Sequence, residues 1–259
     1  MSAFSLKDKT AVITGAGSGI GRSIALKFAK QGANVHILDI NQEHTLEVKK
    51  LIESDGGKCQ THICNVAKQA EVMETFKQIS QEGRIDILVN NAGIGFVGNV
   101  EQTKEEDLDR LYSVNIKGVY NCLYAVIPLM KAAGGGTILN MASVAGSVGI
   151  ADRFGYSMTK GAVLTMTYSV ALDYINDNIR CNSISPARVH TPFVDAYLKK
   201  NYPGKEKEVF AQLEKSQPIG RMGQPDEIAS LAVYLCSEEA AFITGCDYPI
   251  DGGFIKLVP

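Results

Sequence analysis

A serine, a tyrosine and a lysine stand close together in the stretch from Ser143 to Lys160, SVAGSVGIADRFGYSMTK. The i,i+4 spacing of Tyr156 and Lys160 puts both side chains on one face if the segment is helical. A phenol with a pKa of about 10 is a weak base at neutral pH, but a nearby ammonium group favours the phenolate and lowers that pKa. The Ser143 hydroxyl would hold the oxygen of an alcohol or carbonyl while the proton moves. The stretch therefore predicts proton transfer at a substrate oxygen.

A tyrosine and a lysine at this spacing are also a common pair on an exposed helix face. The catalytic interpretation therefore depends on the rest of the chain, which must supply a cofactor and a substrate site. The elements that would position these side chains are predicted from apolar periodicity and from glycine turns.

The first elements form a strand, a glycine-rich turn and a helix. The apolar run TAVIT at residues 10–14 is followed at once by GAGSGIG and by a segment with apolar residues at helical spacing. Glycines 15, 19 and 21 allow a tight turn and a close approach to a pyrophosphate, which the unpaired N–H groups of a helix N-terminus attract. The alternative is a glycine-rich loop without a ligand, and the strand-to-helix context argues against it.

The second strand, NVHILDI, ends near Asp39. An acidic side chain roughly 20 positions beyond such a turn accepts hydrogen bonds from the adenosine ribose and repels a 2′-phosphate, which predicts NAD. Ser18 adds no basic charge that would attract this phosphate, whereas Arg22 is a nearby cation. The alternative for Asp39 is a solvated strand end.

The remaining chain alternates strands and helices as a parallel α/β sheet requires. Helices are expected at 42–54, 67–82, 104–133, 158–175 and 225–236, and strands at 58–63 and in the segments IDILVNNAG, GGGTILNMAS, NIRCNSISPA and CDYPIDGG. Only residues 188–218 depart from this alternation, with helical pieces at 192–200 and 205–215. We expect one domain over residues 1–259, with a substrate lid at about 188–218.

Two polar features in this series are candidates for function. The turn from Asn90 to Gly93 follows an apolar strand, at the sheet edge where α/β proteins bind ligands, although it also suits an ordinary turn. Asn115 lies among apolar residues in the middle of the long helix expected at 104–133. A polar side chain there needs partners or carries a function, and a plain core asparagine is the alternative.

Composition excludes several classes of function. The net charge of −2 gives no general attraction to nucleic acid or to anionic membranes. The six cysteines lack C-x-x-C pairs and zinc-ligand spacing, which favours reduced thiols, no metal site and a cytoplasmic location. Neither a signal peptide nor a membrane span is expected.

Taken together, the motifs resemble the short-chain dehydrogenase/reductase family essentially from end to end. The motifs follow one another in the order that is typical of the family: Thr14-Gly15-x-x-x-Gly19-x-Gly21, Asn90-Asn91-Ala92-Gly93, Asn115, Ser143, Tyr156-x-x-x-Lys160 and Asp251-Gly252-Gly253. The resemblance implies a single-domain, Rossmann-type, doubly wound parallel sheet of seven strands in the order 3-2-1-4-5-6-7. It also implies a nicotinamide cofactor.

The catalytic residues that the resemblance implies are Asn115, Ser143, Tyr156 and Lys160. Tyr156 would exchange the proton, Ser143 would orient the substrate oxygen, Lys160 would lower the tyrosine pKa and hold the ribose, and Asn115 would fix a water that continues a proton relay.

The resemblance also assigns cofactor contacts along the chain. They are Gly15, Ser18, Gly19, Ile20, Gly21, Asp39, Asn65, Val66, Asn91, Ala92, Gly93, Tyr156, Lys160, Pro186, Val189 and Thr191. Two positions depart from the pattern, since Asn65-Val66 stands for Asp-Val beside the adenine and Pro186-Ala187 for Pro-Gly beside the nicotinamide.

Arginines near the catalytic stretch suggest an acid as the substrate. Arg153, Arg188 and His190 are expected at the pocket with Ser143 and Tyr156, because a guanidinium binds a carboxylate in bidentate fashion. The segment SPARVHTPFVDAYLKKNYPGKE resembles sugar-acid dehydrogenases that oxidise 2-keto-3-deoxy-L-fuconate or its rhamnonate relative, and an arginine three residues before the tyrosine also occurs in cytosolic 3-hydroxybutyrate dehydrogenases. A surface arginine paired with Asp152 or solvated is the alternative for Arg153.

These features favour NAD-dependent oxidation of a secondary alcohol in a small hydroxylated carboxylic acid, with a 2-keto-3-deoxy sugar acid as the leading candidate. A 3-hydroxybutyrate-type or polyol dehydrogenase, an acyl-carrier-protein ketoreductase and a catalytically silent NAD-binding sensor are the alternatives. The resemblance further implies a homotetramer, with the helices from Lys104 and Met158 and the apolar end FIKLVP as interfaces.

Overall fold

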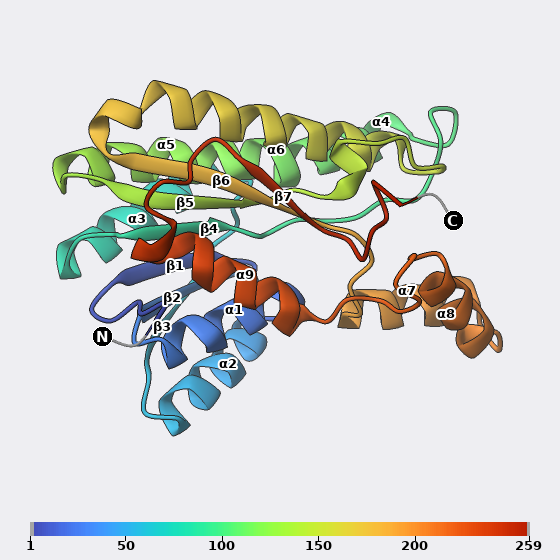
Figure 1. Ribbon diagram of the computed structural model, residues 1–259, viewed down its shortest axis with the longest axis horizontal. Coiled ribbons are helices and arrows are strands. Elements are labelled where there is room, and N and C mark those ends of the chain that lie inside the picture. Colours follow the sequence, from blue (N-terminus) through green and yellow to red (C-terminus); the bar gives the residue numbers. More distant parts are fainter. Residues whose placement is uncertain (1–2, 258–259) are drawn as a thin grey trace.

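The computed structural model describes residues 3–257, except the side chains of residues 200 and 201, and shows one parallel sheet (Figure 1). The strands are β1 (Thr10–Thr14), β2 (Asn34–Asp39), β3 (Lys58–Ile63), β4 (Ile87–Asn90), β5 (Gly136–Met141), β6 (Ile179–Pro186) and β7 (Asp247–Ile250). All neighbouring strands pair in parallel, in the order β3-β2-β1-β4-β5-β6-β7. The predicted fold class and strand order are therefore confirmed.

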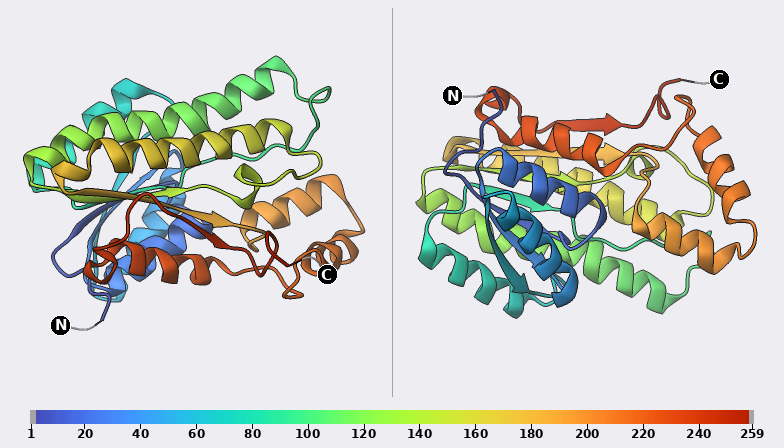
Figure 2. Two further views of the ribbon diagram at one scale, coloured as in Figure 1. Left: turned by 45° about the horizontal axis from the view of Figure 1, so that its top comes forward. Right: turned by 90° about the horizontal axis from the view of Figure 1, so that it is seen from below.

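Helices cover both faces of this sheet (Figures 1 and 2). One face carries α1 (Gly19–Lys30), α2 (Gln42–Ser54) and α9 (Pro225–Cys236), and the other carries α3 (Gln69–Glu82), α4 (Glu105–Leu111), α5 (Gly118–Ala132) and α6 (Phe154–Asp173). Short 3-10 turns are η2 (Val144–Gly146), η3 (Ile175–Asp177) and η4 (Glu238–Ala240). Central strands covered on both sides read as continuous apolar runs, as TAVIT and ILVN do.

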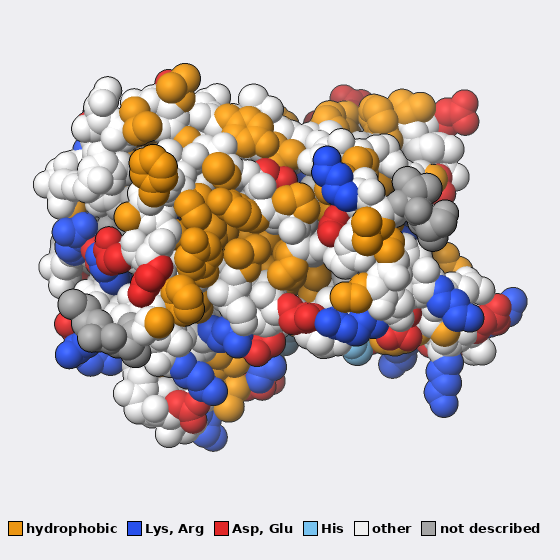
Figure 3. Space-filling model, in the orientation of Figure 1, with side chains coloured by type: hydrophobic (Ala, Val, Ile, Leu, Met, Phe, Trp, Pro, Cys, Tyr) orange, Lys and Arg blue, Asp and Glu red, His pale blue; other side chains and the backbone are white. Residues whose placement is uncertain are grey.

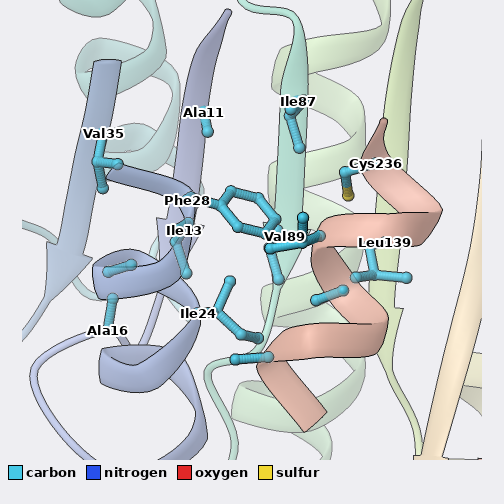
Figure 4. Close-up of a cluster of buried hydrophobic side chains, with 14 of the residues drawn as sticks. Ala11, Ile13, Ala16, Ile24, Phe28, Val35, Ile87, Val89, Leu139 and Cys236 are labelled. Carbon is cyan, nitrogen blue, oxygen red and sulfur yellow. The ribbon is translucent and has the colours of Figure 1, made fainter. Parts of the chain in front are cut away.

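Side chains of each central strand alternate between two separate cores. Ala11 and Ile13 belong to the cluster under α1 and α9, whereas Val12, between them, packs with α3, α5 and α6. Figure 4 shows Ile24 and Phe28 pointing from α1 into the first of these clusters. The sheet is thereby held rigidly from both faces, and its carboxyl edge is free to carry a site.

The long helix predicted at 104–133 is interrupted. A six-residue π-helical segment, η1 (Tyr112–Lys117), joins α4 to α5, and Asn115 lies within it. The prediction of one regular helix was wrong because apolar periodicity does not reveal an extra residue in a turn. Such π-helical turns are frequent at functional sites.

Helix α6 begins at Phe154, four residues before the predicted start. Its first turn packs closely on α4, since a Cβ added to Gly155 would lie 2.9 Å from Leu111 Cδ1. The chain entering α6 is also tied to the loop after β4, because Gly98 N donates to Asp152 O (2.9 Å) and Phe154 N donates to Gly98 O (3.2 Å). Tyr156 and Lys160 consequently share one helix, at the spacing that the proposed chemistry needs.

The predicted lid is a pair of helices, α7 (Pro192–Asn201) and α8 (Glu206–Lys215), which stand beyond the carboxyl edge of the sheet (Figure 1). An isolated parallel bridge between Val189 and Gly223 pins the two ends of the insertion together. His190 N donates to Gly223 O and Gly223 N donates to Arg188 O, each at 2.9 Å. The base of the lid is thus fixed to the domain.

None of the helices in residues 3–257 has the length and apolar character of a membrane span.

Two histidines of the neighbouring strands β2 and β3 make stability depend on pH. His36 Nδ1 lies 3.0 Å from His62 Nε2, and the side chain of His36 is 4% exposed. Burial, followed by the charge of His62, lowers the pKa of His36 from 6.5 to about 4, although Glu82 opposes the shift. The unfolded chain therefore binds more protons than the folded one between about pH 4 and 6.5, so stability is complete above pH 6.5 and is lost as the pH falls.

We expect the melting temperature to fall by at least about 4 °C between pH 7.5 and pH 5, and His36→Leu to flatten this dependence. Thermal melts at both pH values, with the exposed His44→Leu as control, measure it. An unchanged slope in His36→Leu would remove the assignment to this pair.

Candidate active site

A cavity of about 450 Å³ lies at the carboxyl edge of the sheet, between the strand ends and the lid. Its walls come from the loops after β1, β4, β5 and β6, from the start of α6, from the lid and from the segment after β7. The cavity therefore sits where parallel α/β sheets bind ligands, at the ends of several strands.

Three of the four predicted catalytic residues, Ser143, Tyr156 and Lys160, line this cavity. Ser143 follows β5, and its hydroxyl accepts a hydrogen bond from Ala145 N at 3.2 Å and donates to Pro186 O at 3.4 Å. The hydroxyl also forms a hydrogen bond with Tyr156 that lowers the phenol's pKa. Ser143 and Tyr156 thus converge on one point, as binding of a single substrate oxygen requires.

Burial governs the protonation of Tyr156 and Lys160. The pKa of Tyr156 is raised by burial, against the lowering effects of the Ser143 hydrogen bond and the Arg153 charge. The predicted lowering of the Tyr156 pKa is therefore wrong in its net direction, because burial is the largest effect on the phenol. The Lys160 ammonium donates to Met141 O at 2.7 Å and lies 5.8 Å from the Tyr156 ring centre. Burial lowers the pKa of Lys160 to about 8, so this lysine is still cationic at neutral pH.

Asn115 lies behind the cavity and connects two of its walls. Its Oδ1 accepts from Ile94 N (2.8 Å), and its Nδ2 donates to Ile94 O (2.9 Å) and to Thr159 Oγ1 (3.1 Å). A Cβ added to Gly93 would lie 3.3 Å from Asn115 Oδ1 and 3.7 Å from Lys160 Nζ, so the two groups meet at this glycine. Thr159, which sequence reasoning missed, is the link to α6.

The glycine turn has the form that a pyrophosphate needs. Gly15 and Gly19 have φ values of 64° and 54°, in the left-handed region that favours glycine. A Cβ on Gly21 would collide with the carbonyl oxygen of Gly15. The α1 N-cap, Ser18, makes no side-chain capping bond, and the first turn contains no acid. The N–H groups of the first turn of α1 are thus available to an anion, and the turn fits the pyrophosphate of a dinucleotide.

Thr14, the first residue of the glycine motif, organises the opposite side of this turn, a role that the sequence did not predict. Its hydroxyl accepts from Asn91 N and Ala92 N, each at 3.0 Å. The Asn91 amide donates in turn to the carbonyls of Thr14 and Gly15. The Asn-Asn-Ala-Gly turn therefore braces the glycine turn, while Asn91 and Gly93 also line the cavity.

Asp39 ends β2 beside the glycine turn. Its Oδ2 accepts from Gly17 N at 2.9 Å and its Oδ1 from Asn41 N at 3.0 Å. Arg22, the nearby cation, lies 3.6 Å from Glu47, which offsets its charge. A carboxylate held here still presents its remaining lone pairs and its negative charge to a ribose.

The two positions that depart from the family pattern fit the observed backbone. Asn65 Oδ1 accepts from Ala67 N at 3.0 Å, and Val66 packs against Gly118 of α5. Ala187 lies at the cavity between Pro186 and Arg188 and is outside the set of described residues with positive φ. The backbone beside the predicted nicotinamide site therefore does not need a glycine at this position.

Two arginines line the cavity, and their charges interact. Arg153 lines it and donates to the carbonyl of its neighbour Asp152 at 3.1 Å. Arg188 lines it as well, and its Nε donates to Ser216 of the lid at 3.0 Å. The pKa of Arg188 is lowered by burial and then by the charge of Arg153. Among the described lining residues, Arg153, Arg188 and Lys160 are charged and none is acidic, so the cavity attracts anions.

His190 is placed differently from the prediction. It is outside the cavity lining, its Nε2 lies 2.9 Å from Asp195 Oδ1, and its ring packs edge-on against Phe210. It therefore holds the lid together. Sequence reasoning also missed Tyr197 and three phenylalanines in the lining, Phe96, Phe193 and Phe254, which come from three distant segments. The only sequence signal of these phenylalanines is a glycine or proline close by.

Known proteins similar to this chain are oxidoreductases. The family model described as enoyl-(acyl carrier protein) reductase matches residues 15–255. An uncharacterized oxidoreductase of Thermotoga maritima is 42% identical over 245 residues, covering 95% of this chain and 96% of the relative. NAD+-bound xylitol dehydrogenase superposes with a TM-score of 0.89 at 32% identity, over 95% of this chain and 99% of that chain. L-sorbose reductase from Gluconobacter frateurii, complexed with NADPH and L-sorbose, superposes with a TM-score of 0.93 at 30% identity, over 98% of this chain and 99% of that chain.

Proposed function

Since this chain belongs to the short-chain dehydrogenase/reductase family of oxidoreductases, we propose that it oxidises a secondary alcohol in a small hydroxylated carboxylic acid, using NAD. The observation that carries this proposal is one cavity lined by Ser143, Tyr156 and Lys160 together with two arginines, without an acidic side chain among the described lining residues. A carboxylate on the arginines would place the hydroxyl of a small acid within reach of the tyrosine.

The residues of the chain divide the work of proton transfer. A bound nicotinamide supplies hydride exchange. The phenolate form of Tyr156 takes the proton from the substrate hydroxyl, while the Ser143 hydroxyl hydrogen-bonds the same oxygen. Lys160, cationic and held by Met141 O, stabilises the phenolate and offers its other N–H groups to the ribose. Asn115 hydrogen-bonds Thr159 and lies against Gly93, and these contacts fix the surroundings of Lys160.

Asp39 favours NAD over NADP as the cofactor, because its charge opposes a 2′-phosphate. The solved relatives include one structure with NAD+ and one with NADPH, so the family as such allows either. The remaining cofactor contacts follow the family pattern, with Ser18, Ile20, Pro186, Val189 and Thr191 at the cavity wall.

Two carbon skeletons are candidates for the acid. The lid segment resembles that of sugar-acid dehydrogenases, which suggests a 2-keto-3-deoxy sugar acid. A 3-hydroxybutyrate-type acid is the second candidate, and the apolar side chains of the lining favour it. Xylitol and L-sorbose, which appear in the names of two solved relatives, are neutral and carry no carboxylate with which Arg153 and Arg188 could pair.

An acyl-carrier-protein ketoreductase, the activity in the name of a relative from Thermotoga maritima that is 36% identical to this chain, is less well supported. It would be expected to use NADPH, against which Asp39 acts, and the lid carries charges of both signs rather than a basic face. A silent NAD sensor would have no need for the convergence of Ser143 and Tyr156.

Arg153→Met should raise the KM for acid substrates about 10- to 100-fold, because a charge-assisted pair to a carboxylate is lost, and leave turnover of a neutral secondary alcohol unchanged. NADH production from sugar acids, 3-hydroxybutyrate and neutral polyols measures it. The exposed Arg110→Met is the matched control, because Arg110 pairs with Asp107 away from the cavity. Wild-type activity confined to neutral alcohols would overturn the proposal.

We further propose a cytoplasmic homotetramer. The six cysteines are all free, as expected in a reducing compartment. Exposed apolar side chains lie on α5 and α6, among them Tyr124 and Leu172, and Figure 3 shows apolar side chains gathered on the face that carries β7. The last two residues of the predicted C-terminal interface, Val258 and Pro259, lie outside the described residues. A single-chain mass in light scattering would contradict the assembly.

A further inference from the structure

The cavity has two unlike halves. Beside the arginines and the catalytic residues, its lining is apolar and is built from Ile94, Phe96, Phe193, Leu213, Met222 and Phe254. A sugar acid carries several hydroxyl groups, and each needs a hydrogen-bond partner once it is buried.

The polar side chains at this end of the cavity are already engaged. Gln217 Oε1 accepts from Arg188 N at 3.4 Å, and its Nε2 donates to Ser216 at 2.9 Å. The Tyr197 hydroxyl is hydrogen-bonded with Tyr202. Within the described lining, therefore, few groups are left to receive the extra hydroxyls of a sugar acid.

Phe193 forms a wall of this apolar half from the lid. It stands at the start of α7 and is 62% exposed although it lines the cavity. A Cβ added to Gly95 would lie 2.9 Å from Phe193 Cζ. The tip of the ring thus rests on the loop after β4 at a point where only glycine leaves room. Covering an exposed aromatic face with an apolar group of the ligand removes apolar surface from water and therefore favours binding.

The other two aromatic rings are fixed by tight turns. Phe96 lies against Gly98, where a Cβ would be 2.8 Å from its ring. Phe254 follows Asp251, whose carboxylate accepts from Gly253 N (2.9 Å) and Ile255 N (2.8 Å). The Asp-Gly-Gly motif therefore serves to place Phe254 at the cavity.

We infer that the acid taken by this site carries an apolar segment, an alkyl chain or a ring, that packs against Phe96, Phe193 and Phe254. This inference rests on the proposed function, with the carboxylate on the arginines and the hydroxyl at Tyr156. It selects the 3-hydroxy acids over the sugar acids, and it makes Phe193 a specificity-determining residue.

A homologous series of 3-hydroxy acids tests this inference. In the wild type, kcat/KM for 3-hydroxybutyrate, 3-hydroxyhexanoate and 3-hydroxyoctanoate should rise about three- to fourfold per methylene until the wall is covered. Phe193→Ala should flatten this rise through KM. Gly95→Ala, which displaces the ring tip, should reduce the rise in part. Phe210→Ala is the matched control, because Phe210 packs on His190 in the lid and is outside the cavity lining.

The outcomes distinguish a failure of the apolar-segment inference from a failure of the proposed function. Turnover of sugar acids but not of alkyl hydroxy acids, still dependent on Arg153, would overturn the apolar segment and leave the proposed function intact. A chain-length rise that persists in Phe193→Ala would overturn the role of Phe193. Absence of activity on every acid would overturn the proposed function itself.

Discussion

Tyr156→Phe is expected to reduce kcat about 10³-fold while leaving the affinity for NADH within about twofold. The change removes one oxygen, which is the group that carries the proton, and general acid–base groups contribute roughly 10²- to 10⁴-fold to turnover. Because burial raises the Tyr156 pKa, the phenol is protonated at neutral pH, so oxidation should speed up and carbonyl reduction should slow down as the pH rises. Steady-state rates in both directions, with NADH binding followed by fluorescence, measure the effect.

The same helix provides a matched control for this experiment. Tyr168 is exposed on α6 outside the cavity, so Tyr168→Phe should keep wild-type rates and the same pH dependence. Wild-type activity in Tyr156→Phe, or loss of NADH binding together with activity, would remove the tyrosine from the chemistry.

Asp39→Asn is expected to raise the ratio of kcat/KM for NADP to that for NAD by about 100-fold. A like-charge contact with a 2′-phosphate costs several kcal/mol, and the substitution removes that charge at nearly constant shape. Adding Glu47→Gln should increase the ratio further, since it frees Arg22 from the carboxylate 3.6 Å away. Initial rates with both cofactors measure the ratio.

The two carboxylate oxygens of Asp39 accept hydrogen bonds from Gly17 N and Asn41 N. An asparagine side chain has one accepting oxygen, so the variant keeps only one of these two hydrogen bonds. Melting temperatures of wild type and variant therefore separate loop damage from the loss of charge. A wild type that already prefers NADP, or an unchanged ratio in Asp39→Asn, would contradict the proposed role.

Much of the fold could be read from local patterns because they report local physics. Apolar runs of the right length predicted the alternation of strands and helices, and the family resemblance implied the seven-stranded order that the structure confirms. Errors fell where tertiary contacts override local preference. The π-helical segment around Asn115 and the early start of α6 at Phe154 both depend on contacts with other elements, to Ile94 and Thr159 in one case and to Gly98 and Leu111 in the other.

The candidate site was predictable to the extent that its residues follow strands. Gly15, Asp39, Asn91, Ser143 and Pro186 each stand at or just beyond the carboxyl end of a strand, and parallel strands bring those ends to one edge. His190 shows the limit of this reasoning. It follows β6 on the expected side, yet it pairs with Asp195 within the lid rather than facing the cavity.

The sequence by itself determined the alternation of strands and helices, since helical spacing and glycine turns after strands are local properties of the chain. Through the family that its motifs resemble, it also implied the enzyme class, the sheet order and the set of candidate catalytic residues. The tertiary structure decided what surrounds them. Whether Tyr156 is more or less acidic depends on burial, and the apolar half of the cavity exists only because Phe96, Phe193 and Phe254 come together from three segments. Burial and long-range contact depend on the packing of distant segments, which spacing along the chain does not specify.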